Sequence, residues 1–229
     1  MKKNKATCDA NSCFMCQNCI EEWRPAICAN KTNYKLRKGE LIFKEGDPVT
    51  GIYFVYSGNV KVYKKWDADK ELILRFAKDG AILGHRGIGD DLIYPISASA
   101  LEDSVVCYID MKFFESTLKV NNQLTFQLVN FFANELRVSE RRMRNLAHMP
   151  VKGRVADALL KLQAQFGKTD SGLININLSR QDLASYAGAT YETVFRVINE
   201  LVNENCISLT GKSIAIVNTD ALTELTKSA

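Results

Sequence analysis

The spacing of apolar residues changes part-way along the chain. Between residues 34 and 110, apolar side chains recur two positions apart in the pairs Leu41 and Phe43, Tyr53 and Val55, Val60 and Val62, and Leu72 and Leu74. Turn-forming residues such as Ser57-Gly58-Asn59 separate these pairs. Short strands at such even spacing predict an antiparallel β-roll, within an α+β fold.

From residue 111 to 148 the spacing becomes helical. The pairs at its start, such as Phe113 and Phe114, are explained by a helix that packs on its own domain. The later residues form a seam longer than a small β domain covers, which favours a dimer interface. This predicted seam, with one polar break, is Val129, Phe132, Leu136, Ser139, Met143 and Leu146. Met149-Pro150 ends the helix, and 151–166 predicts the first helix of the next domain.

Residues 179–201 have the pattern of two short helices joined by a tight turn. Ser179 is suited to cap a helix over 180–187, and Gly188 to end it in the left-handed conformation. Thr190 is suited to cap the second helix. Residues 207–217 predict two strands around the turn Thr210-Gly211-Lys212. This order is typical of a winged helix-turn-helix, whereas a solvated helical hairpin would explain the two helices alone.

The second helix offers side chains suited to read DNA. In a helix-turn-helix this helix enters the major groove, with its first residues at the base edges. A glutamate accepts hydrogen bonds from cytosine, and an arginine donates two to guanine. The candidate DNA-binding residues are Ser179, Arg180, Thr190, Tyr191, Glu192, Phe195, Arg196 and Lys212.

Length and composition bound the organisation of the chain. Its 229 residues, 46% hydrophobic and 24% charged, suit two modest cores. We expect a cysteine-rich head at 1–33, a β-roll sensor domain at 34–110, a dimerisation helix at 111–148 and a winged-helix domain at 149–229. The net charge of +4 permits a nucleic-acid partner without requiring one. Neither a signal peptide nor a membrane-spanning run is evident, which predicts a cytoplasmic protein with reduced thiols.

The head carries the densest group of chemically reactive side chains. Four thiols are spaced C-x4-C-x2-C-x2-C, at Cys8, Cys13, Cys16 and Cys19, and Cys28 follows. Thiolates three residues apart converge on one metal, so the four predict a [4Fe-4S] cluster or, as the alternative, a zinc ion. A head this small and polar would gain its stability from the metal. The other interpretation is a disordered tail with free thiols.

The predicted order of β-roll, long helix and winged helix resembles the Crp/Fnr family of bacterial transcription regulators over nearly the whole chain. The motifs that carry the resemblance are Lys38-Gly39-Glu40, Phe43-Lys44-Glu45-Gly46-Asp47, the turn Ser57-Gly58, and Glu192-Thr193-Val194-Phe195-Arg196. The resemblance implies a homodimer on a palindromic operator, with Glu192 and Arg196 reading TGA-type half-sites. Phe195 stands where the best-known branches have a small residue, and Tyr191 is also unusual there. RNA polymerase is a further implied partner, and the turn at 66–70 is a candidate surface for it.

The resemblance also distinguishes between effectors. Members that bind cyclic AMP carry a Gly-Glu pair and a later Arg-Ser or Arg-Thr pair around its phosphate. Residues 80–89 and 94–97 contain neither pair, and only Arg86 offers a charged partner, so cyclic AMP is not expected. The stretch resembles the Fnr branch, in which three head cysteines and one roll cysteine hold a cluster. That mapping implies alternative ligands at Cys28 and Cys107, although Cys28 follows Cys19 by nine residues instead of six.

These features rank the possible functions. We expect a DNA-binding transcription regulator that responds to redox state, O2 or NO through the head. The alternative is a regulator that senses a small molecule in the roll, with a zinc or metal-free head. A cupin-like metalloenzyme is a remote alternative, because such sites need several histidines and the chain has only His85 and His148. No nucleophile elbow, phosphate loop or HExxH motif is present, so we expect no enzyme activity.

Overall fold

The computed structural model describes residues 1–4, 13–67 and 70–227, which divide into two compact units. The first unit is 1–135 and the second is 136–229. The boundary falls within the long helix α4 (Asn122–His148), and each unit is described by itself below. In the described part, no helix is both long enough and apolar enough to cross a membrane.

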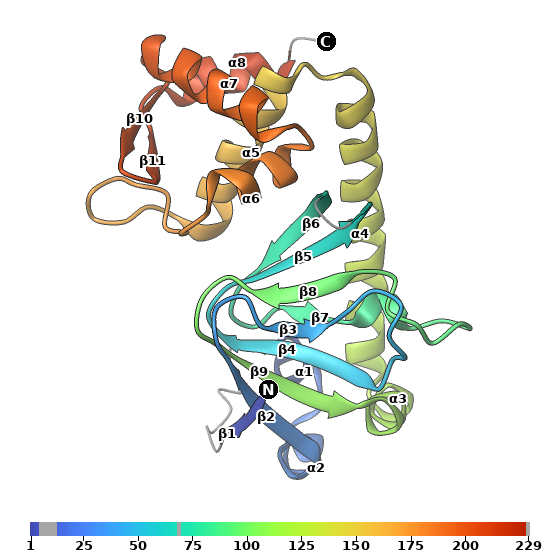
Figure 1. The fold of residues 1–229 in the computed structure, drawn as a ribbon. Coiled ribbons are helices and arrows are strands. Elements are labelled where there is room, and N and C mark those ends of the chain that lie inside the picture. The colour runs from blue at the N-terminus through green and yellow to red at the C-terminus, as the bar shows by residue number, and fades with distance from the viewer. Residues whose placement is uncertain (5–12, 68–69, 228–229) are drawn as a thin grey trace. The chain divides into compact units, whose positions relative to one another are not determined.

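The first unit contains two antiparallel sheets, which confirms the predicted β-roll (Figure 1). One described sheet has the order β1-β2-β9-β4-β7 and the other β3-β8-β5-β6. The strands of the first sheet are β1 (Lys2–Asn4), β2 (Lys31–Leu36), β4 (Gly51–Ser57), β7 (Ile82–Leu83) and β9 (Ser104–Asp110). Those of the second are β3 (Leu41–Phe43), β5 (Val60–Lys65), β6 (Glu71–Ala77) and β8 (Ser97–Ala100).

Strand β4 is buried on both faces, which explains its continuous apolar run. Tyr53 and Val55 belong to the core between the two sheets. Ile52 and Phe54 belong to a second core, which the helices of this unit share. The tight turn that follows β4 depends on Gly58, whose φ is +91° and whose absent Cβ would lie 2.4 Å from the Ser104 hydroxyl oxygen. A side chain at this position is therefore excluded by both backbone strain and space.

The buried side chains of β6 differ from the pair that shows the period-two pattern. Leu72 and Leu74 are half-buried, whereas Ile73 and Phe76 are buried. The β5–β6 pairing shifts register between Val62 and Tyr63, as at a β-bulge. A shift of one residue exchanges the two faces of a strand, so the alternation along β6 alone did not reveal the buried face.

The helices of the first unit cover the second core. They are α1 (Phe14–Asn18), η1 (Glu21–Trp23), α2 (Arg24–Asn30), η2 (His85–Gly87), α3 (Met111–Val120) and α4. The single helix expected from residue 111 is in fact two, because the chain breaks at Asn121. Asn121 is fully buried, and its side-chain oxygen accepts a hydrogen bond from the Ile20 backbone N–H at 2.9 Å. The residue at the break therefore contacts the head at Ile20, which is 101 residues away in the sequence.

The second unit has the elements of a winged helix, largely with the predicted bounds (Figure 1). Beyond the end of α4 it contains α5 (Val151–Phe166), α6 (Arg180–Ala187), α7 (Tyr191–Asn203), β10 (Ile207–Thr210), β11 (Ser213–Ile216) and α8 (Thr219–Lys227). Strands β10 and β11 pair antiparallel around the predicted turn. Helix α8 was not anticipated; it packs on α5, with Leu222 fully buried.

Candidate nucleic-acid interface and cysteine head

The turn between α6 and α7 is built from the predicted caps. The Ser179 hydroxyl accepts the Asp182 N–H at 2.9 Å, and the Asp182 carboxylate accepts the Ser179 N–H, which completes a capping box. Gly188 ends α6 at φ +66°. The Thr190 hydroxyl then caps α7 by accepting the Thr193 N–H at 3.3 Å. These local bonds fix where α7 begins, and therefore which side chains stand at its N-terminal end.

Arg154 on α5 anchors the end of α6, a role that the sequence did not reveal. Its guanidinium donates to the backbone oxygens of Ala187 at 2.9 Å and Gly188 at 3.2 Å, and to that of Met149 at 2.8 Å. Burial lowers the pKa of this arginine from its ordinary value. The carbonyl groups at a helix end lack hydrogen-bond partners within the helix. The Arg154 side chain therefore satisfies backbone oxygens that would otherwise be unpaired.

The outward face of α7 carries four of the eight side chains predicted to meet DNA. Tyr191 is 42% exposed and Phe195 51%, and the side chain of Arg196 is 74% exposed. Glu192 is also exposed. The opposite face is buried through Val194, Val197, Ile198 and Leu201. The helix is thus held by one face and presents the other, as groove insertion requires.

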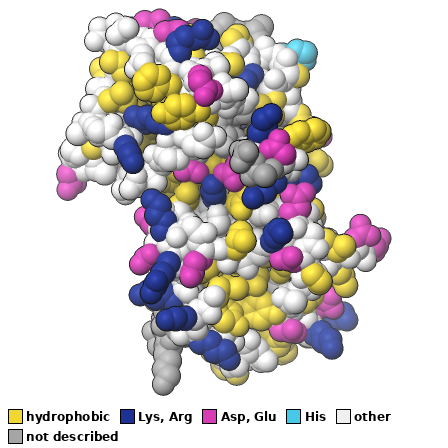
Figure 2. Space-filling view, in the orientation of Figure 1, with side chains coloured by type: hydrophobic (Ala, Val, Ile, Leu, Met, Phe, Trp, Pro, Cys, Tyr) yellow, Lys and Arg dark blue, Asp and Glu magenta, His cyan; other side chains and the backbone are white. Residues whose placement is uncertain are grey.

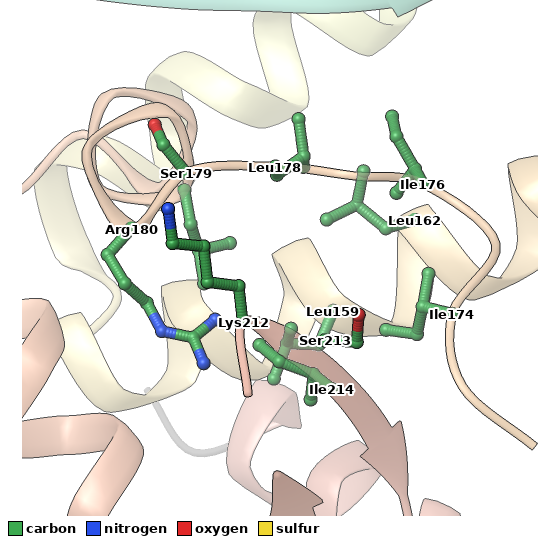
Figure 3. Close-up of a pocket in the computed structure, with 11 residues that line it drawn as sticks. Leu159, Leu162, Ile174, Ile176, Leu178, Ser179, Arg180, Lys212, Ser213 and Ile214 are labelled. Atoms are coloured by element: carbon green, nitrogen blue, oxygen red, sulfur yellow. The ribbon is translucent and has the colours of Figure 1, made fainter. Parts of the chain in front are cut away.

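Three more of the predicted contacts gather beside α6. Ser179, Arg180 and Lys212 line one side of a surface pocket, as Figure 3 shows. Its other side is apolar and includes Leu162 and Ile174. The structure therefore brings the wing turn next to the N-terminal end of α6. A hydroxyl group and two cations in one place suit contacts to phosphate oxygens.

Charge alone does not mark the interface. On the face drawn in Figure 2, basic and acidic side chains are interspersed over both units. Basic residues cluster in the chain near residue 150, but Arg154 has the anchoring role above, and Arg142 donates to the Tyr186 backbone oxygen at 2.8 Å. Lys152 lies 2.5 Å from a Glu204 carboxylate oxygen. Part of this basic cluster is therefore structural.

The predicted seam follows one side of α4. Val129, Leu136 and Met143 recur every seven residues and are 58%, 60% and 59% exposed. The alternate seam positions, also seven apart, are half-buried: Phe132, Ser139 and Leu146. The Phe132 ring lies 5.5 Å from that of His85, so this residue also packs on its own roll.

The cysteine head is folded onto the roll of its own unit. Cys13, Cys16 and Cys19, on and around α1, are 7%, 4% and 7% exposed. They share one buried core with Cys107 on β9, which is 4% exposed. Cys28 is exposed, and Cys8 lies outside the described residues. Cys206 is buried in the second unit.

The head is held by specific contacts with α3 and α4. The Trp23 indole donates to the Thr117 hydroxyl at 3.1 Å and stacks on Phe113. Phe14 packs against Phe131, with ring centroids 5.6 Å apart. Burial is the main effect on the Cys19 thiol and raises its pKa from 9.0, although the nearby Arg24 acts in the opposite direction.

The head thiols meet one of two requirements for a metal site, which are suitable donor atoms and a close grouping of ligands. Their chemistry is that of zinc and iron–sulfur ligands. Over residues 1–4, 13–67 and 70–227, however, no three or more cysteine, histidine or acidic side chains are gathered closely enough to hold an ion. The described head therefore supplies suitable donors without presenting a finished ligand cage.

A charged cluster joins η2, β6 and α4 within the first unit. Arg86 donates to the Glu135 carboxylate at 2.6 Å, and His85 Nε2 lies 3.9 Å from the same oxygen. Arg75 donates to the Ile82 backbone oxygen, and its guanidinium carbon lies 5.8 Å from the centre of the Phe131 ring. Arg86, the one charged group that the sequence offered for a nucleotide phosphate, is thus paired with an acid of the chain itself.

Comparison with known proteins agrees with this architecture. Residues 34–121 match the cyclic nucleotide-binding domain model, and residues 153–225 match the Crp-like helix-turn-helix domain model. The transcriptional activator protein Anr of Pseudomonas aeruginosa is 31% identical over 197 residues, which cover 85% of this chain and 80% of that protein. The chain belongs to the Crp/Fnr family.

Other Crp/Fnr proteins show the same likeness. The anaerobic regulatory protein of Bacillus subtilis is 31% identical over 188 residues, covering 80% of this chain and 79% of that protein. The structure of FixK2 from Bradyrhizobium japonicum superposes with a TM-score of 0.77 at 27% identity, covering 87% of this chain and 98% of that one. The Crp/Fnr chain described here is a DNA-binding transcription regulator of this type.

Proposed function

We propose that this regulator binds a palindromic operator as a homodimer and responds to O2, NO or redox state through a cluster held by its cysteine head. The observation that carries the DNA-binding part is the outward face of α7, which is capped, rigidly held and exposed. The names of the Pseudomonas and Bacillus relatives support a role in anaerobic regulation.

Base reading falls to Glu192 and Arg196, with phosphate contacts from Ser179, Arg180, Thr190 and Lys212. Replacing Glu192 or Arg196 by alanine removes one base-reading side chain from each half-site. We expect each variant to lose about 10- to 100-fold in affinity for its operator. The control is Lys227→Ala on α8, which should bind normally. Wild-type binding that does not fall steeply with salt would contradict the proposal.

Dimerisation is assigned to the exposed seam of α4. Leu136→Glu places a charge in the middle of the seam and should give a monomer in light scattering. Arg141→Glu is the matched control, because Arg141 is exposed and lies away from the heptad positions of the seam. A Leu136→Glu protein that remains dimeric would show that the interface lies elsewhere.

The head is the proposed metal centre, with Cys8, Cys13, Cys16 and Cys19 as ligands and Cys28 and Cys107 as alternatives. The burial of three head thiols beside Cys107 supports a shared site. When bound, an iron–sulfur cluster supplies a group that reacts with O2 and NO, whereas zinc is redox-inert. The protein's own part is to hold the thiols and to limit the access of water.

Anaerobic purification followed by an absorption spectrum and iron, sulfide and zinc analysis tests this centre. Visible absorption with iron and sulfide would support the cluster. Single serine variants of the six candidate ligands should then identify which thiols hold it, with Cys206→Ser as the control that changes nothing. A colourless protein with one zinc per chain would instead favour the alternative, a regulator that senses a small molecule in the roll.

RNA polymerase remains a proposed partner. Trp66, in the turn after β5, is 88% exposed, which is unusual for a large aromatic side chain. Trp66→Ala should leave operator binding unchanged and reduce activated transcription in a purified system. Unchanged transcription would remove this surface from the proposal.

A further inference from the structure

Two aromatic rings lie together on the outward face of the recognition helix α7. Tyr191 and Phe195 are one turn apart, with ring centroids separated by 6.2 Å and ring planes inclined by 16°. Both are about half exposed. Because four other side chains form the buried face of α7, these rings are not needed to hold the helix in its domain.

Their position follows from helix geometry. At about 100° per residue, Phe195 projects about 60° to one side of Glu192, whereas Arg196 projects about 40° to the other side. Glu192 therefore lies between an apolar flank and a cationic flank. Tyr191 extends the apolar flank towards the first residue of the helix.

The major groove offers a specific complement to an apolar flank. Glutamate and arginine there meet hydrogen-bonding groups, but the 5-methyl group of thymine is an apolar feature of a base edge. A ring that contacts it removes apolar surface from water on both sides. A small residue at position 195 would not project far enough to make this contact in the same way.

We propose that Phe195 is a specificity residue that contacts the 5-methyl group of a thymine beside the base pairs read by Glu192 and Arg196. Tyr191 stacks on Phe195 and limits the positions open to its ring. This inference rests on the proposed operator binding. The flank thus selects for thymine over cytosine by its methyl group, and it accepts 5-methylcytosine at the same edge.

The test begins with an operator that the full-length, anaerobically purified protein selects from random DNA. Each thymine of one half-site is replaced in turn by deoxyuridine, which removes only the methyl group, and affinity is measured by fluorescence anisotropy. We expect one position at which the replacement weakens wild-type binding about fourfold, the value for one buried methyl-sized group. Cytosine there should bind worse than 5-methylcytosine.

Matched variants assign the effect to the ring. Phe195→Ser should bind the thymine and deoxyuridine operators equally, whereas Phe195→Leu should keep part of the difference. Arg196→Ala should bind more weakly but retain the methyl effect. Failure to select any sequence would overturn the proposed function itself. Successful selection without a methyl effect, or with an undiminished effect in Phe195→Ser, would overturn this inference alone.

Discussion

Each unit contains an arginine that is at least partly buried, and the two are hydrogen-bonded to different extents. In the winged helix, Arg154 donates to the backbone oxygens of Met149, Ala187 and Gly188. In the roll, Arg75 is buried with its Nε lacking a hydrogen-bond partner, and both ring nitrogens of His85 lack one too. Burial lowers the pKa of Arg75 from its ordinary value, although the negative charge of Glu135 acts in the opposite direction.

The two arginines differ in whether their hydrogen-bonding groups are satisfied. A buried polar group that is fully bonded holds one geometry, whereas an unbonded one costs free energy in that geometry. The winged helix thus fixes the turn that aims α7. The roll retains an incompletely bonded charge cluster where η2 and β6 meet α4, the helix that carries the proposed seam.

Removing the acid should have the largest effect. Burial opposes the ionisation of Glu135, but His85, Arg75 and Arg86 outweigh it and lower its pKa from 4.5 to about 2. Glu135→Gln leaves two arginines without their counter-charge and should lower the free energy of unfolding by about 3 kcal/mol. Because the two tryptophans, Trp23 and Trp66, both lie in the first unit, their fluorescence during urea unfolding measures this.

The matched control is Glu140→Gln, at an exposed position of the same helix. It should change stability by less than about 0.5 kcal/mol. The contribution of Glu135 should be present above pH 4.5 and disappear as the pH falls towards 2. A Glu135→Gln protein as stable as the wild type would mean that the two arginines do not need this counter-charge, and the contrast between the units would fail.

Arg154→Ala should have the next largest effect, confined to the second unit. Four backbone oxygens lose this donor, two of them at the end of α6, so we expect a loss of about 2 kcal/mol. Faster amide hydrogen exchange in α6 reports it, because this unit contains no tryptophan. Arg141→Ala, an exposed arginine, is the control that should leave exchange unchanged. Equal exchange in both variants would show that α6 does not depend on this anchor.

Sequence reasoning succeeded where the determinants are local. The bounds of α6 and the start of α7 follow from Ser179, Gly188 and Thr190, which act within a few residues of themselves. It failed where distant segments decide. At the break, the Asn121 side chain accepts a hydrogen bond from a backbone N–H of the head. The buried face of β6 depends on the register of its pairing with β5.

The same distinction holds for the candidate sites. The candidate DNA-binding residues of α7 stand out because an amphipathic helix exposes whatever it does not bury. Arg154, Arg75 and Glu135 were missed because a single charged residue in a helix or strand has the same pattern whether it is solvated or buried. The thiols of the head were noticed by their spacing, but their burial beside Cys107 comes from the packing of the head on the roll.

The smallest predicted effect is a dependence of stability on pH. Burial lowers the pKa of His85 from 6.5, so the folded roll resists a proton that the unfolded chain accepts. Stability should therefore fall as the pH drops below 6.5, and the loss at pH 5.5 is about 1.4 kcal/mol at most. Arg75, Arg86 and Glu135 face this ring, and of these Glu135 titrates only at lower pH.

Urea unfolding at pH 7.5 and 5.5, followed by tryptophan fluorescence, measures this loss. His85→Phe keeps an aromatic ring against Phe131 and Phe132 but takes no proton, so its stability should change less between the two pH values. His148→Gln changes the only other histidine, which is exposed, and should retain the wild-type difference. If His85→Phe retains it as well, the buried cluster does not respond to pH in this range. The contrast between the units would then rest on Glu135 alone.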